Sequence, residues 1–168
     1  MLERKLLEQF CQWLYDSAIG IGIRESIWVF PIIETVHVLG ITLLVGTVAI
    51  LDLRLLGVVL KREPVARVAG SVLPLTWAGF GVMFVSGFLL FWSEAAQSYA
   101  NPAFRIKLVL LLLAGLNPLI FHFTIYRTVG DWNHRIVTPL GARLAGLFSL
   151  TLWGGIICAG RAIAYFQK

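Results

Sequence analysis

The sequence predicts an all-α integral membrane protein, an up-down bundle of four transmembrane helices preceded by an amphipathic helix that lies in the membrane interface. Its composition is 58% hydrophobic over 168 residues and its mean hydropathy is +0.83, both above the values of a soluble domain. Four apolar stretches of about 17–25 residues have the length needed to cross ~30 Å of hydrocarbon. These stretches are 27–51, 72–92, 108–126 and 144–160. Each is a continuous apolar run and not an alternating pattern, which disfavours a β-barrel. We expect one membrane domain over residues 1–168.

The first 18 residues are too short and too polar to span the membrane. They form an amphipathic pattern whose apolar positions fall on one helical face: Leu2, Leu6, Phe10, Trp13 and Leu14. Such a helix is expected to lie in the membrane interface, although docking on a partner subunit would need the same pattern. Gly20 and Gly22 are expected to end it.

Turn and capping residues divide the rest of the chain into four helices. Ser26 is a candidate N-cap for the first, and Gly57 is expected to turn the chain after it. Pro74 is expected in the first turn of the second, and Pro118 is expected to kink the third. The predicted transmembrane helices cover about 26–56, 71–94, 103–128 and 139–166, joined by short loops that include the polar segment 130–135. This arrangement is typical of an up-down bundle.

Basic residues are concentrated at helix ends and in loops, and they give a net charge of +5. This placement is typical of contacts with lipid headgroups and does not favour nucleic acid as a partner. We call the membrane side of the N-terminus side A and the opposite side side B. The two side-B loops carry more Lys and Arg than the single side-A loop. We therefore expect a bacterial inner membrane protein with side B in the cytoplasm and both termini periplasmic.

Cys11 and Cys158 are the only cysteines and lie at opposite ends of the chain. Without CxxC spacing, neither a disulfide framework nor a zinc site is expected.

Three ionisable residues inside the apolar stretches are the candidates for function: Glu34, His37 and His122. A charged group in lipid costs about 2.5–3.5 kcal/mol on insertion scales, so such residues need a partner or a role. Glu34 and His37 are three residues apart and share one helix face. We expect Glu34 to point into the bundle and to pair with Arg161 or Lys107. A di-iron site would need a second Glu-x-x-His pair, which the chain lacks.

His37 and His122 are candidate metal ligands, and Glu34 is a third. Simple helix geometry puts His122 about 12 Å deeper from side A than His37. One haem held by both histidines, ligation by His37 alone, and two separate sites all remain open. Gly40, one turn after His37, leaves room either for a flat cofactor or for close helix packing.

Charged residues near the two membrane edges complete the candidate set. Arg161 and Lys107 lie near side A and are candidate partners for carboxylates such as haem propionates. Asp52 and Arg54, near side B, are expected to form an ion pair.

Five segments of the chain resemble an uncharacterised family of small bacterial four-helix membrane proteins: Trp28-Val-Phe-Pro-Ile-Ile-Glu-Thr-Val-His37-Val-Leu-Gly40, Leu51-Asp-Leu-Arg-Leu-Leu-Gly57, Asn101-Pro-Ala-Phe-Arg-Ile-Lys107, Asn117-Pro-Leu-Ile-Phe-His122 and Gly160-Arg-Ala-Ile-Ala-Tyr165. The resemblance covers nearly the whole chain and implies no activity.

The His37-x-x-Gly40 helix and the run that begins at Lys107 are more distantly similar to a second group. This is the membrane superfamily of the copper-resistance D permeases and the J-type protoporphyrinogen oxidase. In the J-type oxidase, histidines on the first and third helices bind b-type haem. The resemblance implies haem ligation by His37. The third-helix histidine expected near Pro118 is displaced one turn, to His122.

We therefore expect a b-type-cytochrome-like, haem-binding protein in electron transfer or a redox step, working with a redox partner. Two alternatives stay open. The first alternative is a copper-ion permease that uses Glu34 and His37. The second is a non-catalytic accessory subunit of a larger membrane complex. A scarcity of soft ligands, two Met and two Cys in all, weighs against copper.

Overall fold

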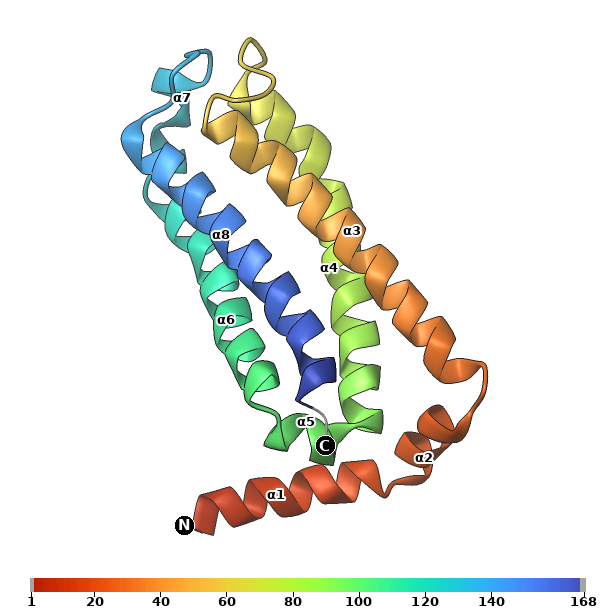
Figure 1. Cartoon of the computed structure of the whole chain (residues 1–168). Coiled ribbons are helices and arrows are strands. Elements are labelled where there is room, and N and C mark those ends of the chain that lie inside the picture. Colours follow the sequence, from red (N-terminus) through yellow and green to blue (C-terminus); the bar gives the residue numbers. More distant parts are fainter. Residues whose placement is uncertain (1, 167–168) are drawn as a thin grey trace.

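Four long helices form the body of the protein in a computed structural model that describes residues 2–166. They are α3 (Val29–Leu55), α4 (Val65–Ser93), α6 (Pro102–Phe123) and α8 (Leu140–Ala162). Successive long helices run in opposite directions, and the two ends of the chain lie at the same end of the bundle (Figure 1). All four are long and apolar enough to cross a membrane. The described residues contain no strand, and the predicted all-α membrane bundle is confirmed.

The four long helices pack as two hairpins, α3 with α4 and α6 with α8. The two hairpins are joined by the contact of α3 with α8. α3 packs along α4 and also against α8, and α8 packs against α6. The α4 and α6 helices share no extended packing in the described part of the chain. They meet near side A, where the rings of Phe91 and Phe104 stack with their centroids 5.5 Å apart. The contact between α3 and α8 therefore joins the two pairs of helices.

Glycines set the close approach of α3 to its neighbours. A β-carbon on Gly79 of α4 would lie 2.9 Å from the backbone nitrogen of Leu44. A β-carbon on Gly146 of α8 would lie 3.0 Å from the backbone oxygen of Asp52. Small residues at helix crossings are the usual means by which membrane helices pack closely.

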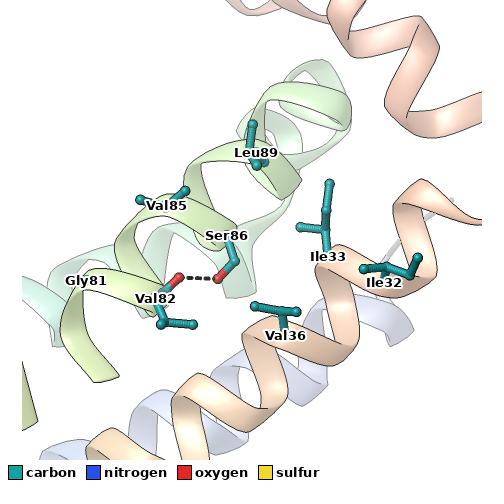
Figure 2. Close-up of a pocket in the computed structure, with 8 residues that line it drawn as sticks. All are labelled: Ile32, Ile33, Val36, Gly81, Val82, Val85, Ser86 and Leu89. Carbon is teal, nitrogen blue, oxygen red and sulfur yellow. Dashed lines mark hydrogen bonds between the residues drawn. The ribbon is translucent and has the colours of Figure 1, made fainter. Parts of the chain in front are cut away.

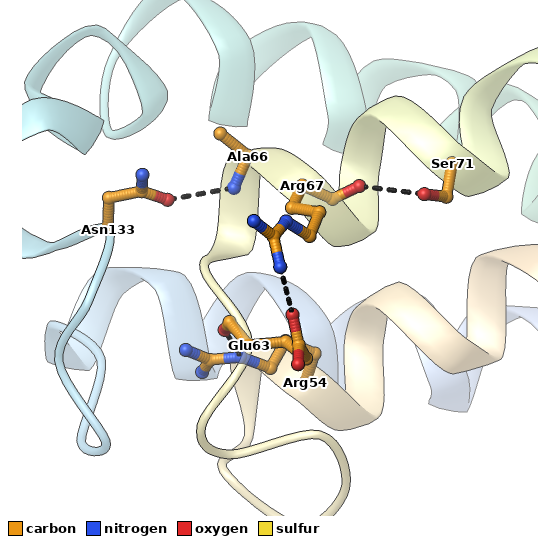
Figure 3. Close-up of polar contacts among 6 residues, drawn as sticks. All are labelled: Arg54, Glu63, Ala66, Arg67, Ser71 and Asn133. Atoms are coloured by element: carbon orange, nitrogen blue, oxygen red, sulfur yellow. Dashed lines mark hydrogen bonds and ion pairs between the residues drawn. The ribbon is translucent and has the colours of Figure 1, made fainter.

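Side B is held together by side chains that join its two loops (Figure 3). The side chain of Arg54 is fully buried and donates to the backbone oxygens of Glu63, at 2.8 Å, and Arg135, at 3.2 Å. Asn133 accepts hydrogen bonds from the first turn of α4, through its Oδ1 from the Ala66 nitrogen at 2.8 Å and through its backbone oxygen from Val65. Segments 61–67 and 130–136 therefore lie on the same side, as an up-down bundle requires.

Gly57 ends α3 as predicted. Its φ of +71° is in the left-handed region, and the Val58 nitrogen donates to the Leu53 oxygen at 2.9 Å, the bond expected where a helix ends on glycine.

The predicted start of the second transmembrane helix is wrong by six residues, because α4 begins at Val65 and not at Ser71. Pro64 precedes the helix, and the distant Asn133 supplies its cap. Pro74 consequently lies inside α4 and not in its first turn. The third helix is shorter than predicted: α6 ends at Phe123, and the connection to α8 contains the short helices η1 (Tyr126–Thr128) and α7 (Val129–Trp132).

The N-terminal segment lies across the side-A end of the bundle (Figure 1). It forms two helices, α1 (Leu2–Tyr15) and α2 (Ala18–Glu25), and α1 packs on the short helix α5 (Ala95–Ala100). The side chains of Cys11 and Leu14 are buried against Ala95. An apolar face of α1 stays exposed, with Leu6, Leu7, Phe10 and Trp13 each more than half exposed. An exposed apolar face across one end of the bundle is what an interfacial helix requires.

The predicted break at Gly20 and Gly22 is wrong. The chain breaks at Ser17, whose side chain caps α2 by accepting from the Gly20 nitrogen at 3.1 Å. Gly20 lies inside α2, where a β-carbon would come within 2.6 Å of the Leu14 oxygen. This glycine is needed for the approach of α2 to the end of α1, not for a turn. Met1, Gln167 and Lys168, which belong to the predicted domain, lie outside the described residues.

Candidate functional site

His37 lies at the packed interface between α3 and α4. It is the ninth residue of α3, so its Cα lies about 12 Å from the start of the helix. The side chain is half-buried against α4, where a β-carbon on Gly87 would lie 3.0 Å from the ring carbon Cε1. The glycine therefore makes room for the imidazole itself.

A hydrogen-bond chain fixes the state of the His37 ring. His37 Nδ1 lies 2.9 Å from Ser86 Oγ, and Ser86 Oγ lies 2.5 Å from the backbone oxygen of Val82. A carbonyl oxygen only accepts, so the single hydroxyl proton of Ser86 is donated to Val82. Ser86 must then accept from Nδ1–H of His37. The neutral imidazole consequently carries its free lone pair on Nε2, the atom that can bind a metal or receive a proton.

Lys107 is the cation whose charge acts on the imidazole of His37. It is half-buried on α6, and its charge acts on the His37 ring. Its Nζ lies beside α8, 3.8 Å from the position that a β-carbon on Gly160 would take. No described residue forms a hydrogen bond or an ion pair with this ammonium group. An ammonium group held at half-burial without an anion is suited to a carboxylate or phosphate ligand.

His122 does not join this site. It is near the end of α6, and its Cα lies about 30 Å from the start of that helix against about 12 Å for His37 in α3. The side chain is exposed and its ring stacks on Tyr126 with centroids 5.7 Å apart. The offset of about 18 Å in depth exceeds the 12 Å expected from the sequence. His37 and His122 are therefore not brought together.

The expectation that Glu34 points into the bundle is wrong. Its side chain is exposed, and it forms no ion pair with Arg161 or Lys107. The 27 residues of α3 span about 40 Å, about 10 Å more than the hydrocarbon, and Glu34 lies only about 7.5 Å from the side-A end. Its carboxylate can therefore reach the headgroup region, so an interior partner is not required. Arg161, near the same membrane edge, is also exposed.

The space beside Gly40 is occupied by protein. A β-carbon there would lie 3.0 Å from Val82 Cγ1 and 3.3 Å from Met83 Cγ. Gly40 thus serves the packing of α3 on α4. Within residues 2–166, no three His, Cys, Asp or Glu side chains lie close enough together to hold a metal ion.

An apolar groove of about 420 Å³ runs between α3 and α4, and Ser86 is part of its lining. Figure 2 shows Ile32, Ile33 and Val36 of α3 facing Val82, Val85, Ser86 and Leu89 of α4 across it. Ser86 as a whole residue is only 4% exposed, and its hydroxyl is hydrogen-bonded to His37 and to Val82.

Ser86 and Asp52 are the polar residues whose positions the sequence did not reveal. From the sequence, Ser86 is simply one of several small residues on its helix. In the structure its hydroxyl is hydrogen-bonded to His37 and to the Val82 oxygen, and these two bonds fix the tautomer and orientation of the imidazole. Asp52 is buried beside Ser149 of α8, and its Oδ2 has no hydrogen-bond partner among the described residues. The predicted ion pair between Asp52 and Arg54 is absent from the described part of the chain, because Arg54 faces the loops and not α8.

Comparison with known proteins gives a family without an assigned activity. Neither a curated protein nor a solved structure matches the chain. Residues 10–166 match the model of a family of unknown function, DUF6644. This match covers all four transmembrane helices and the second part of α1. The chain belongs to the DUF6644 family.

Proposed function

We propose that this protein binds a b-type haem in the membrane, with Nε2 of His37 as an axial ligand, and that it takes part in electron transfer or a redox step. The hydrogen bond between His37 and Ser86 carries this proposal. It leaves the lone pair on Nε2 and holds the ring in one orientation, as partners of metal-binding histidines commonly do. The distant similarity of the His37-x-x-Gly40 helix to the copper-resistance D and J-type oxidase superfamily points the same way.

The other residues of the site fit a haem in part. Lys107 supplies an unpaired ammonium group near the imidazole, suited to a propionate. Arg161 is exposed near the same membrane edge and is a second propionate partner. Gly40 contributes packing rather than space. His122 is too far along its helix to share one haem with His37.

A bound haem would supply a one-electron carrier within the membrane. The chain contributes three things to it. His37 binds through Nε2, Ser86 fixes the tautomer and orientation of the imidazole, and Lys107 offsets negative charge in a region of low dielectric.

The test is the visible spectrum of the protein purified in detergent from cells supplied with a haem precursor. We expect a Soret band that shifts on reduction and a b-type product in the pyridine haemochrome assay. His37→Ala should lose this haem. His122→Ala, a matched change of an exposed histidine, should keep most of it. A colourless parent protein, or equal haem in the parent and His37→Ala, contradicts the proposal.

The accessory-subunit alternative is favoured by a different observation. The span that contains α6 is the most exposed of the four, and α6 does not pack along α4 in the described part of the chain. A second membrane protein would find an open face there. Co-purification of a stoichiometric partner with a colourless protein would support this alternative over haem binding.

The copper alternative lacks an assembled ligand set in the described residues. The three-residue spacing of Glu34 and His37 predicts that they share a helix face. In the structure Glu34 is exposed, whereas His37 packs on α4. Elemental analysis of the same preparations distinguishes copper from haem iron. For the location we propose the bacterial inner membrane with side B in the cytoplasm. Side-specific labelling of single cysteines introduced at Lys61 and at Gln97 checks that orientation.

A further inference from the structure

A second pocket, of about 360 Å³, lies at the side-A end between α1, α5 and the first turn of α6. Its wall includes the small side chains Ala96 and Ala100. Its polar lining comes from Glu8 and Gln12 of α1, Tyr99 of α5 and Arg105 of α6. This pocket shares no residue with the proposed haem site.

Arg105 is held in position at one wall of the pocket. Its Nε donates to the backbone oxygen of Tyr99 at 3.0 Å, and its guanidinium carbon lies 5.1 Å from the centroid of the Tyr99 ring. These contacts use Nε and one face of the guanidinium group. The two terminal Nη groups form no hydrogen bond with any described residue. They remain available as a pair of donors, the geometry that binds phosphate oxygens.

Glu8 supplies the opposite charge. Its carboxylate lines the same pocket but forms neither an ion pair with Arg105 nor a hydrogen bond with another described residue. Gln12, one turn further along α1, donates from Nε2 to Asp16 at 2.9 Å and keeps its Oε1 oxygen as an acceptor. One pocket therefore presents a cation and an anion that do not neutralise each other.

The position of α1 sets the depth of the pocket in the membrane. The exposed side chains of Leu6, Phe10 and Trp13 place one face of α1 in the apolar part of the interface. The opposite, polar face of a helix in that position lies at the level of the lipid headgroups. Glu8 and Gln12 belong to this polar face.

We propose that this pocket binds the headgroup of a zwitterionic phospholipid with a primary amine, such as phosphatidylethanolamine. The phosphate lies against the Nη groups of Arg105. The ammonium group donates to the Glu8 carboxylate and to Gln12 Oε1. A primary ammonium has three N–H donors, whereas the quaternary ammonium of phosphatidylcholine has none. The pocket should therefore discriminate between these two lipids, which carry the same net charge.

The test is native mass spectrometry of the purified protein with phosphatidylethanolamine, phosphatidylcholine and phosphatidylglycerol of identical acyl chains. We expect phosphatidylethanolamine to be retained about tenfold better than either competitor, the size of one charge-assisted hydrogen bond. Excess free O-phosphoethanolamine should displace it if the headgroup alone is recognised. Retention despite that excess assigns the site to the intact lipid. Equal retention of phosphatidylethanolamine and phosphatidylcholine by the parent protein overturns the proposal.

Variants locate the site. Arg105→Gln and Glu8→Gln should each reduce the preference to the level of non-specific binding, and both positions are exposed, so the fold should tolerate them. Arg67→Gln and Glu63→Gln remove the same charges from an exposed ion pair at side B and should leave the preference unchanged. An unchanged preference in both pocket variants also overturns the proposal. Haem content, which depends on His37, is expected to be the same in all four.

Discussion

The imidazole of His37 on α3 and the hydroxyl of Ser86 on α4 are joined by a hydrogen bond of 2.9 Å that determines which ring nitrogen of His37 carries the proton. The serine is able to do this because its own proton is already donated to the Val82 oxygen in the preceding turn. A residue type that usually serves close packing in membrane helices thus sets the chemistry of the one interior histidine.

Ser86→Ala tests that relationship. Loss of the acceptor for Nδ1–H frees the ring to change tautomer and orientation, and haem affinity should fall about 10–100-fold, as for other lost partners of metal-binding histidines. Haem titration of the apoprotein measures the change. Ser71→Ala is the matched control, since Ser71 lies on the same helix and its hydroxyl is bonded only to the Arg67 oxygen. Equal affinity in the two variants would show that Ser86 does not position His37.

Gly79→Ala should destabilise the pair of helices α3 and α4. The added β-carbon would lie 2.9 Å from the Leu44 backbone nitrogen, and a backbone atom cannot move aside as a flexible side chain can. Overpacking of this kind costs about 1–3 kcal/mol. Gly81→Ala, two residues on, meets nothing within 4 Å and should be neutral or slightly stabilising. Thermal unfolding in detergent, followed by circular dichroism, compares the two.

Asn133→Ala should destabilise the start of α4. It removes the Oδ1 acceptor of the Ala66 N–H, and loss of a helix cap costs about 0.5–2 kcal/mol. Asn133→Asp keeps an acceptor at the same place and should restore most of the loss. Unfolding midpoints of the three proteins provide the comparison, and an Asp variant no better than the Ala variant would argue that the side chain does not act as a cap.

Cys11 should react slowly with alkylating reagents in the folded protein. Burial raises the pKa of its thiol above the ordinary value, and the thiolate is the reactive form. The unfolded chain therefore loses this proton first as the pH rises, so the contribution of Cys11 to stability is present at neutral pH and is lost as the pH rises through the folded-state pKa. The Cys158→Ser protein isolates Cys11. Its N-ethylmaleimide labelling rate between pH 7 and 10 should lag behind that of the same protein unfolded in detergent and urea.

Leu60→Gly should be neutral or stabilising. Leu60 has a φ of 50°, in the left-handed region, within the exposed loop that follows α3. A side chain in this conformation costs roughly 1–2 kcal/mol relative to glycine, which offsets the greater freedom of glycine in the unfolded chain. Leu6→Gly, within α1, should instead destabilise its helix by about 1 kcal/mol. Thermal unfolding of both variants measures the contrast.

The four spans were predictable because they follow from length and hydropathy, which do not depend on how the helices pack. Gly57 was predictable for a similar reason, since the φ it must adopt is a local property. The face of each helix was not, because the spans are apolar on all sides and nothing in their pattern separates lipid from interior. Glu34 was therefore assigned to the wrong side, whereas His37, on the same predicted face, packs against α4.

Contacts between residues that are far apart in the sequence could not be predicted either. The start of α4 depends on Asn133, 67 residues away, so local capping rules place it too late. Ser86 and His37 are 49 residues apart, and only the packing of α3 on α4 brings them together. His122 was a candidate ligand on the third helix, but its side chain is exposed near the end of α6.

The cap that Asn133 provides has a consequence for biosynthesis. A ribosome that makes roughly 5–20 residues per second needs about 3–13 s to advance the 67 residues from Ala66 to Asn133. α3 is already made when that interval begins and α4 is completed within it, but the leading amide groups of α4 still lack their acceptors. The first hairpin becomes complete only after α6 has crossed the bilayer and returned the chain to side B. Insertion of the second hairpin is thereby the event that finishes the first, and a truncated chain that stops before Asn133 leaves α4 frayed at its leading end.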